Sequence, residues 1–189
     1  MARRIVQVSQ TGERFVFDDD WNDSHGRVKH LEYVLQPNCK VPEHYHPATS
    51  QTFEILSGTL HVRVSGGDPL ALNRGDRATT GIDGVHTQWN EGPDPVTVKE
   101  SYDPPLDIEP FFTVLPHAMA TKNVLKRVIF ASDFDSISAL ASKPGRLAVA
   151  VLAPLGRLFG LAHWYEPLLS DSATRLDRPT SEWGAPTAT

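Results

Sequence analysis

The feature that most constrains this chain is a series of short segments in which apolar and polar residues alternate. They cover residues 5–8, 15–17, 31–35, 52–56, 59–64, 70–72, 85–89 and 96–102. Turn-forming residues separate them, as in the Gly-Gly-Asp-Pro run at 66–69. A period of two is the pattern of strands with one buried face. Many short strands with no helical pattern between them predict an all-β sandwich or barrel over residues 1–104.

The overall composition narrows the class of protein. A chain of 189 residues suits one buried core with an extension. The formal net charge is −5 with both signs well mixed, which argues against a nucleic-acid partner. The single cysteine, Cys39, cannot form an internal disulfide, and no apolar run follows the first two arginines. Both observations predict a cytoplasmic protein.

The alternation ends after the two prolines at 104 and 105. Apolar residues then recur at three- to four-residue intervals between 111 and 129, and 133–140 is a further short helix candidate. We therefore expect residues 105–170 to form a helical extension, packed on the barrel or at an interface. Residues 171–189 are rich in Ser, Thr, Pro and Asp, a composition that predicts a flexible tail.

Residues 147–165 are the most apolar part of the chain. Pro154, Arg157 and His163 interrupt this run. We predict a buried or interface helix pair broken at Pro154 rather than a membrane span, with membrane contact through 147–165 as the lesser alternative. Apolar helices of this kind can supply a subunit contact, so we expect a homodimer.

Two histidine clusters indicate a metal site. His44 and His46 lie two residues apart in an extended segment, so their side chains leave the same face of the strand. Gln51 follows a short turn and is a further donor that can converge on them. His86 lies on a later strand. A barrel can bring these three imidazoles to one ion, a ligand type that suits a transition metal.

The two clusters resemble the paired motifs of the cupin superfamily. The first motif, G(X)5HXH(X)3–4E(X)6G, is matched by His44, His46 and Gly58. The second, G(X)5PXG(X)2H(X)3N, is matched by Gly75, His86 and Asn90. The resemblance covers about residues 30–102. It implies a double-stranded β-helix, or jelly-roll cupin barrel, with a metal near one mouth.

The chain departs from these motifs at four positions. Asn38 replaces the first glycine, and Asn is among the residues that best tolerate a positive φ. Gly81 and Asp83 replace the proline and middle glycine of the second motif, and we expect Gly84 to supply the turn one residue later. Gln51 replaces the usual glutamate ligand.

The resemblance therefore implies a ligand set of His44, His46, Gln51 and His86, with no formal negative charge. An amide oxygen is a weaker ligand than a carboxylate and cannot take a proton, so the ion keeps more of its Lewis acidity. Fe, Mn, Ni and Zn all suit such a set as a single divalent ion. The alternative is that Gln51 only forms hydrogen bonds, in a barrel that holds little metal.

Another group must then move protons in any acid–base reaction. Glu100 and Tyr102 share one face of the strand 96–102 with two valines, which makes both candidate catalytic residues. For Glu100 the alternative is a salt bridge at the sheet edge. Tyr33 and Gln88 either line the same pocket or belong to the core.

These observations lead us to expect a mononuclear metal-dependent cupin enzyme that acts on a small oxygenated molecule. Lewis-acid chemistry of an isomerase, lyase or cyclase is the first expectation. A metal-dependent dioxygenase of the quercetin-dioxygenase-like type is the second. A non-catalytic ligand-binding cupin is the third.

Overall fold

The fold was analysed in a computed structural model that describes residues 4–18, 21 and 26–175, with side chains described up to residue 170. The strands are β1 (Arg4–Val8), β2 (Glu13–Phe17), β3 (Lys29–Leu35), β4 (His44–Tyr45), β5 (Ser50–Ser57), β6 (Thr59–Val64), β7 (Leu70–Asn73), β8 (Arg77–Thr80), β9 (His86–Trp89), β10 (Val96–Asp103) and β11 (Ala139–Leu140). The helices are α1 (Ile108–Ala120), α2 (Val124–Asp133), α3 (Lys143–Leu158) and α4 (Glu166–Arg175).

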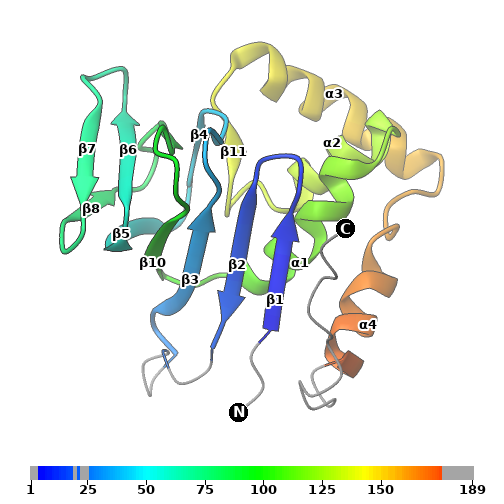
Figure 1. The fold of residues 1–189 in the computed structure, drawn as a ribbon. Helices are drawn as coiled ribbons and strands as arrows, with labels where there is room; N and C mark the ends of the chain where they lie inside the picture. The colour runs from blue at the N-terminus through cyan, green and yellow to red at the C-terminus, as the bar shows by residue number, and fades with distance from the viewer. Residues whose placement is uncertain (1–3, 19–20, 22–25, 176–189) are drawn as a thin grey trace.

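The strands form two antiparallel sheets. The first has the order β1-β2-β3-β10-β5-β8, and the second has the order β11-β4-β9-β6-β7. Strands adjacent in sequence often lie in different sheets, as β9 and β10 do, which is the connectivity of a jelly roll. The helices gather on one side of the strands (Figure 1). The predicted jelly-roll barrel with C-terminal helices is confirmed.

Strand β10 shows why alternation was a reliable guide to the core. Val96, Val98, Glu100 and Tyr102 are all buried, while the residues between them are half-buried. The strand lies in the middle of the first sheet, between β3 and β5. Its inward face therefore reaches the centre of the barrel, as predicted, and carries two polar groups among apolar neighbours.

Two turns explain the departures from the cupin motifs. Asn38 has a φ of 57°, so it takes the left-handed conformation expected of the glycine it replaces. Asp83 also has a positive φ, of 62°, whereas Gly84 does not. The prediction that Gly84 supplies this turn is wrong, because Asp83 adopts the conformation itself. Asp shares with Asn an enriched occupancy of this region.

Two short strands form outside the segments in which the alternation predicts strands. The segment after Gly75 forms β8, which pairs with β5. Backbone pairing with a buried neighbour outweighs weak local propensity there. Residues 133–140 do not form a helix: α2 ends at Asp133, and Ala139–Leu140 form β11, which pairs with β4.

Helix α3 continues through Pro154 and is not broken there. Proline removes the hydrogen bond to the carbonyl of Ala150, but both residues are solvent-exposed, so water can reach that carbonyl. The helix ends at Leu158, and Gly160 follows with a φ of 77°. On its inner side Gly156 lies so close to α2 that a Cβ there would stand 2.7 Å from Ile129 Cδ1.

The outer side of α3 is apolar and exposed. Leu147, Val151, Leu155 and Leu158 are each at least 44% exposed. Only one side of the apolar run is therefore buried, against α2. Within the part of the chain that the structure describes, each helix is too short or too polar to cross a bilayer. Helix α4 extends to Arg175, so residues 171–175 are helical and not a tail, and 176–189 lie outside the described residues.

Candidate metal centre and cavity

The three histidines of the two motifs meet in the second sheet. His44 on β4 faces His86 on β9 in the strand register, and His46 follows directly after β4. Their ligating nitrogens all lie within 4.8 Å of one another. The predicted convergence of His44, His46 and His86 is therefore present in the structure, and such a group can hold a metal ion.

Each of these imidazoles is oriented by a backbone carbonyl. The Nδ1 of His44 lies 2.8 Å from the carbonyl oxygen of Pro42, and that of His86 lies 2.9 Å from the carbonyl oxygen of Gly84. The Nδ1 of His46 donates to the carbonyl of Ile137. A carbonyl only accepts, so the proton of each ring is on Nδ1. All three Nε2 lone pairs are left to coordinate an ion.

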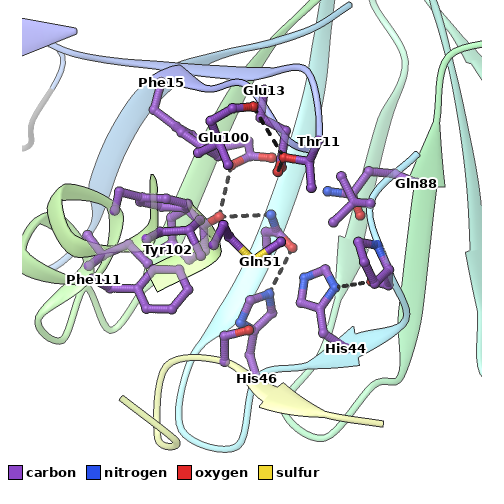
Figure 2. A pocket seen from close by; sticks show the side chains of 18 of the residues that line it. Thr11, Glu13, Phe15, His44, His46, Gln51, Gln88, Glu100, Tyr102 and Phe111 are labelled. Atoms are coloured by element: carbon purple, nitrogen blue, oxygen red, sulfur yellow. Dashed lines mark hydrogen bonds between the residues drawn. The ribbon is translucent and has the colours of Figure 1, made fainter. Parts of the chain in front are cut away.

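Gln51 adds a fourth lone-pair donor. Its Oε1 lies 3.0 Å from Nε2 of His46 and 2.9 Å from Nε2 of His86. The amide orientation follows from the other end of the side chain. Its Nε2 donates to the Tyr102 hydroxyl at 2.9 Å, and that hydroxyl donates to Glu100 Oε2 at 2.8 Å (Figure 2). The oxygen of the amide must therefore face the histidines.

This arrangement tests whether the residues fit a metal. The imidazole nitrogens and the Gln51 oxygen all point lone pairs at one place, and nothing between them supplies a proton when each Nδ1 is protonated. Acceptor atoms this close repel one another unless a cation lies among them. Neutral nitrogen and amide oxygen donors of this kind fit one divalent transition metal ion.

Burial keeps the histidines in the form that binds metals. Desolvation lowers the pKa of His44 to about 3 and that of His86 to about 4, and it also lowers the pKa of His46. The mutual repulsion of the rings acts in the same direction on His44 and His86. All three are therefore neutral near pH 7, as metal coordination requires.

A cavity of about 140 Å³ opens beside the histidines. Its polar lining includes His44, His46, Gln51, Gln88, Glu100 and Tyr102. Apolar residues of α1 form another part of the wall, including Phe111, Phe112, Leu115 and Met119. Phe112 stacks on Phe15 of β2 with ring centroids 3.9 Å apart, which attaches α1 to the barrel. The helical extension thus encloses the space next to the candidate metal centre.

Two buried carboxyl groups face this cavity from the first sheet. Burial raises the pKa of Glu100 to about 8, against the smaller opposing effect of the Tyr102 hydrogen bond. Burial likewise raises the pKa of Glu13 to about 7, and the hydrogen bond from Thr11 opposes the rise. Each carboxyl can therefore hold a proton near neutral pH.

The structure brings all six predicted site residues to one place. Gln51, Glu100 and Tyr102 line the cavity with His44 and His46, and His86 contacts Gln51 beside it. Glu100 forms no edge salt bridge, because it is 1% exposed in the centre of the sheet. Gln88 lines the cavity, whereas Tyr33 belongs to the apolar core.

Sequence reasoning missed Glu13, Thr11 and the Ile137 carbonyl. Glu13 could have been found, because Glu13, Phe15 and Phe17 alternate along β2 and are all buried. The Ile137 carbonyl is a backbone atom from a distant segment, so no residue pattern marks its role. The same holds for Thr11, which reaches the cavity wall from a turn.

The fold and this site define the protein as a jelly-roll barrel with an imidazole-rich centre at one end of an internal cavity. Residues 31–105 match the family model of the Cupin domain, Cupin_2. No curated protein matches the sequence.

Several solved structures are similar at low identity. A double-stranded β-helix protein of Klebsiella pneumoniae is 24% identical, with a TM-score of 0.39, over 42% of this chain and 69% of its own. KdgF of Halomonas sp. is 16% identical, with a TM-score of 0.49, over 56% of this chain and 90% of its own. DMSP lyase DddQ of Ruegeria pomeroyi is 18% identical, with a TM-score of 0.40, over 43% of this chain and only 41% of its own. Likeness of this degree says nothing about activity.

Proposed function

We propose that the protein is a mononuclear metal-dependent enzyme that acts on a small oxygenated molecule by redox-neutral Lewis-acid chemistry, as an isomerase, lyase or cyclase does. The observation that carries the proposal is the convergence of three Nε2 lone pairs and the Gln51 oxygen. His44, His46, Gln51 and His86 would hold the ion, with Fe, Mn, Ni or Zn as the candidates. When bound, a divalent ion polarises a carbonyl or hydroxyl oxygen of the substrate.

Glu100 and Tyr102 supply the proton transfer in this proposal. Glu100 is buried, and its Oε1 has no hydrogen-bond partner among the described residues, so one oxygen is free to contact a ligand. Its raised pKa suits a group that both gives and takes a proton near neutral pH. Tyr102 holds the other oxygen at 2.8 Å and fixes the direction of the carboxyl group.

The buried acid is what favours proton transfer over the other two expected functions. Gln51 cannot act as a base, because an amide does not take a proton at neutral pH. Glu100 lies in the same cavity and can perform that step instead.

Elemental analysis of the purified protein tests the metal site directly. We expect close to one transition-metal ion per chain in the wild type and a loss of most of it in His86→Ala. His61→Ala is the matched control, because His61 stacks on Trp89 of the same sheet and lies outside the cavity lining. The proposal fails if the wild type carries no more metal than His86→Ala.

A further inference from the structure

The wall of the cavity away from the histidines is acidic. Thr11, Glu13 and Glu100 lie together on that side, and Gln51 lies between them and the histidines (Figure 2). Glu13 and Glu100 come from β2 and β10 of the same sheet. Each carboxylate, when ionised, raises the pKa of the other groups nearby, as the effect of Glu13 on Glu100 shows. A second polar region therefore exists beyond the candidate metal centre.

This lining contains no positively charged side chain. Among the described residues that line the cavity, three are glutamates and none is lysine or arginine. The third glutamate, Glu43, is exposed and pairs with Arg63, so it does not alter the buried wall. Proteins that recognise a phosphate or carboxylate at the far end of a ligand do so with Arg or Lys. Nothing on this wall could offset such a charge.

The cavity lining also carries polar atoms that lack partners. Gln88 Oε1 and Glu100 Oε1 are buried without a hydrogen bond among the described residues. A buried acceptor without a donor costs free energy, and a ligand hydroxyl or amine would satisfy it. Both side chains line the cavity. Gln88 Oε1 therefore needs a hydrogen-bond donor on the ligand, and Glu100 Oε1 needs one when its carboxyl group is ionised.

The size of the cavity limits the ligand further. The cavity volume of about 140 Å³ is below the roughly 300–1,000 Å³ of pockets that hold drug-sized ligands. Phe15, Phe111 and Phe112 make the remaining wall apolar. A compact molecule with one carbon face and donors at its far end fits these surfaces.

We infer that the ligand of this site is a small uncharged or cationic molecule that places a hydroxyl or amine group against Glu13 and Glu100. Molecules with a phosphate or carboxylate at that end are rejected. The metal-binding end of this ligand rests on the proposed function, whereas its distal end rests only on the cavity lining.

Hydroxamates with a common metal-binding head and different tails test this inference. Glycolohydroxamate has a hydroxyl tail, glycine hydroxamate an ammonium tail, propionohydroxamate an apolar tail and malonomonohydroxamate a carboxylate tail. Calorimetric titration of the metal-loaded protein should show the hydroxyl and ammonium tails bound at least about tenfold more tightly than the carboxylate tail. Equal or tighter binding of malonomonohydroxamate overturns the inference.

The variant Glu13→Gln tests which residue sets the preference. It should remove most of the advantage of glycine hydroxamate over propionohydroxamate. Glu54→Gln is the matched control, because Glu54 is on the outer face of β5 beside Arg77 and should leave the order unchanged. An unchanged order in Glu13→Gln counts against the inference. If Glu13→Gln does not fold, the wild-type order alone decides.

Failure of the proposed function can be told apart from failure of this inference. If elemental analysis finds no ion, the metal site fails, and the four tails are then compared on ion-free protein by ligand-observed NMR at millimolar concentration. If the four tails keep the same order of affinity, the inference about the acidic wall is supported. If the carboxylate tail binds most tightly, the inference is overturned. If the ion is present and all four tails bind equally, only the inference fails.

Discussion

The imidazole of His46 is oriented by the backbone carbonyl of Ile137, a residue that lies 91 positions later in the chain. His46 belongs to the barrel, whereas Ile137 follows α2 in the helical extension. Directly after it, β11 pairs with β4, the strand that carries His44. The extension therefore holds two of the three candidate metal ligands in place.

Ile137→Ala should weaken metal binding as well as the fold. The side chain is 2% exposed, so truncation is expected to lower the free energy of unfolding by about 2–4 kcal/mol. Loosening the segment should also disturb the carbonyl that orients His46. Ile129→Ala is the control, because Ile129 is equally buried but packs between α2 and α3, away from the site. Metal titration at a temperature where both variants are folded should show weaker affinity only in Ile137→Ala. Equal affinities would contradict the coupling.

Tyr102→Phe should weaken the metal site without removing a ligand. The Tyr102 hydroxyl accepts from Gln51 Nε2 and so keeps Gln51 Oε1 facing the histidines. Without this hydroxyl, the Gln51 amide can rotate so that its Nε2 donates to an imidazole. That hydrogen bond occupies the lone pair of the imidazole, which is then less available to a metal ion. Loss of an orienting partner typically lowers metal affinity by about 10–100-fold. The measurement is competition with a chelator. Tyr165→Phe, which loses a hydroxyl bonded to Asp133 outside the cavity, should leave the affinity unchanged.

Gln51→Glu should raise metal occupancy at a given free-ion concentration. A carboxylate brings a negative charge to a set of ligands that has none, and it binds divalent ions more strongly than an amide. Removing the ion should then destabilise Gln51→Glu more than the wild type, because the buried carboxylate loses its counter-charge. Gln36→Glu, at an exposed position, is the charge-matched control. Unchanged occupancy in Gln51→Glu would mean that residue 51 does not coordinate.

The stability that Glu13 gives to the ion-free protein should be lost as the pH rises from about 4.5 to 8. Burial raises the pKa of Glu13 from 4.5 to about 7, so the folded state favours the protonated acid. Its stabilising contribution is full below pH 4.5 and is lost as the pH passes 7. The loss is up to about 3 kcal/mol. The lowered pKa values of His44, His46 and His86 act in the opposite direction below pH 6.5, so the comparison is made between two variants that share them. Urea denaturation across this range should show that the stability of the wild type falls relative to that of Glu13→Gln. A constant difference between the two would contradict the raised pKa.

Local patterns in the sequence predicted the barrel and the polar residues on its inner faces. The alternation of β10 placed Glu100 and Tyr102 inside, and the spacing of His44 and His46 placed both rings at one point. These predictions succeeded because side-chain direction in a strand depends only on neighbouring residues. The continuity of α3 through Pro154 depended instead on solvent access to one carbonyl, which the sequence does not encode locally.

Long-range pairing accounts for what the sequence could not show. Strand β11 exists because β4 offers it an edge, although the residues themselves suggested a helix. The carbonyl of Ile137 is a backbone atom, so no residue type marks its role. The cavity wall formed by Phe111 and Phe112 required knowledge of where α1 packs.

The histidine ligands can be counted by NMR spectroscopy. This is possible because backbone carbonyls accept from the Nδ1 atoms of His44, His46 and His86. Each keeps an exchangeable proton on the same ring as a coordinating nitrogen. In protein loaded with paramagnetic Co(II), these protons should resonate far outside the ordinary amide range and disappear in heavy water. One such signal belongs to each bound imidazole, so the NMR spectrum itself would report how many histidines hold the ion.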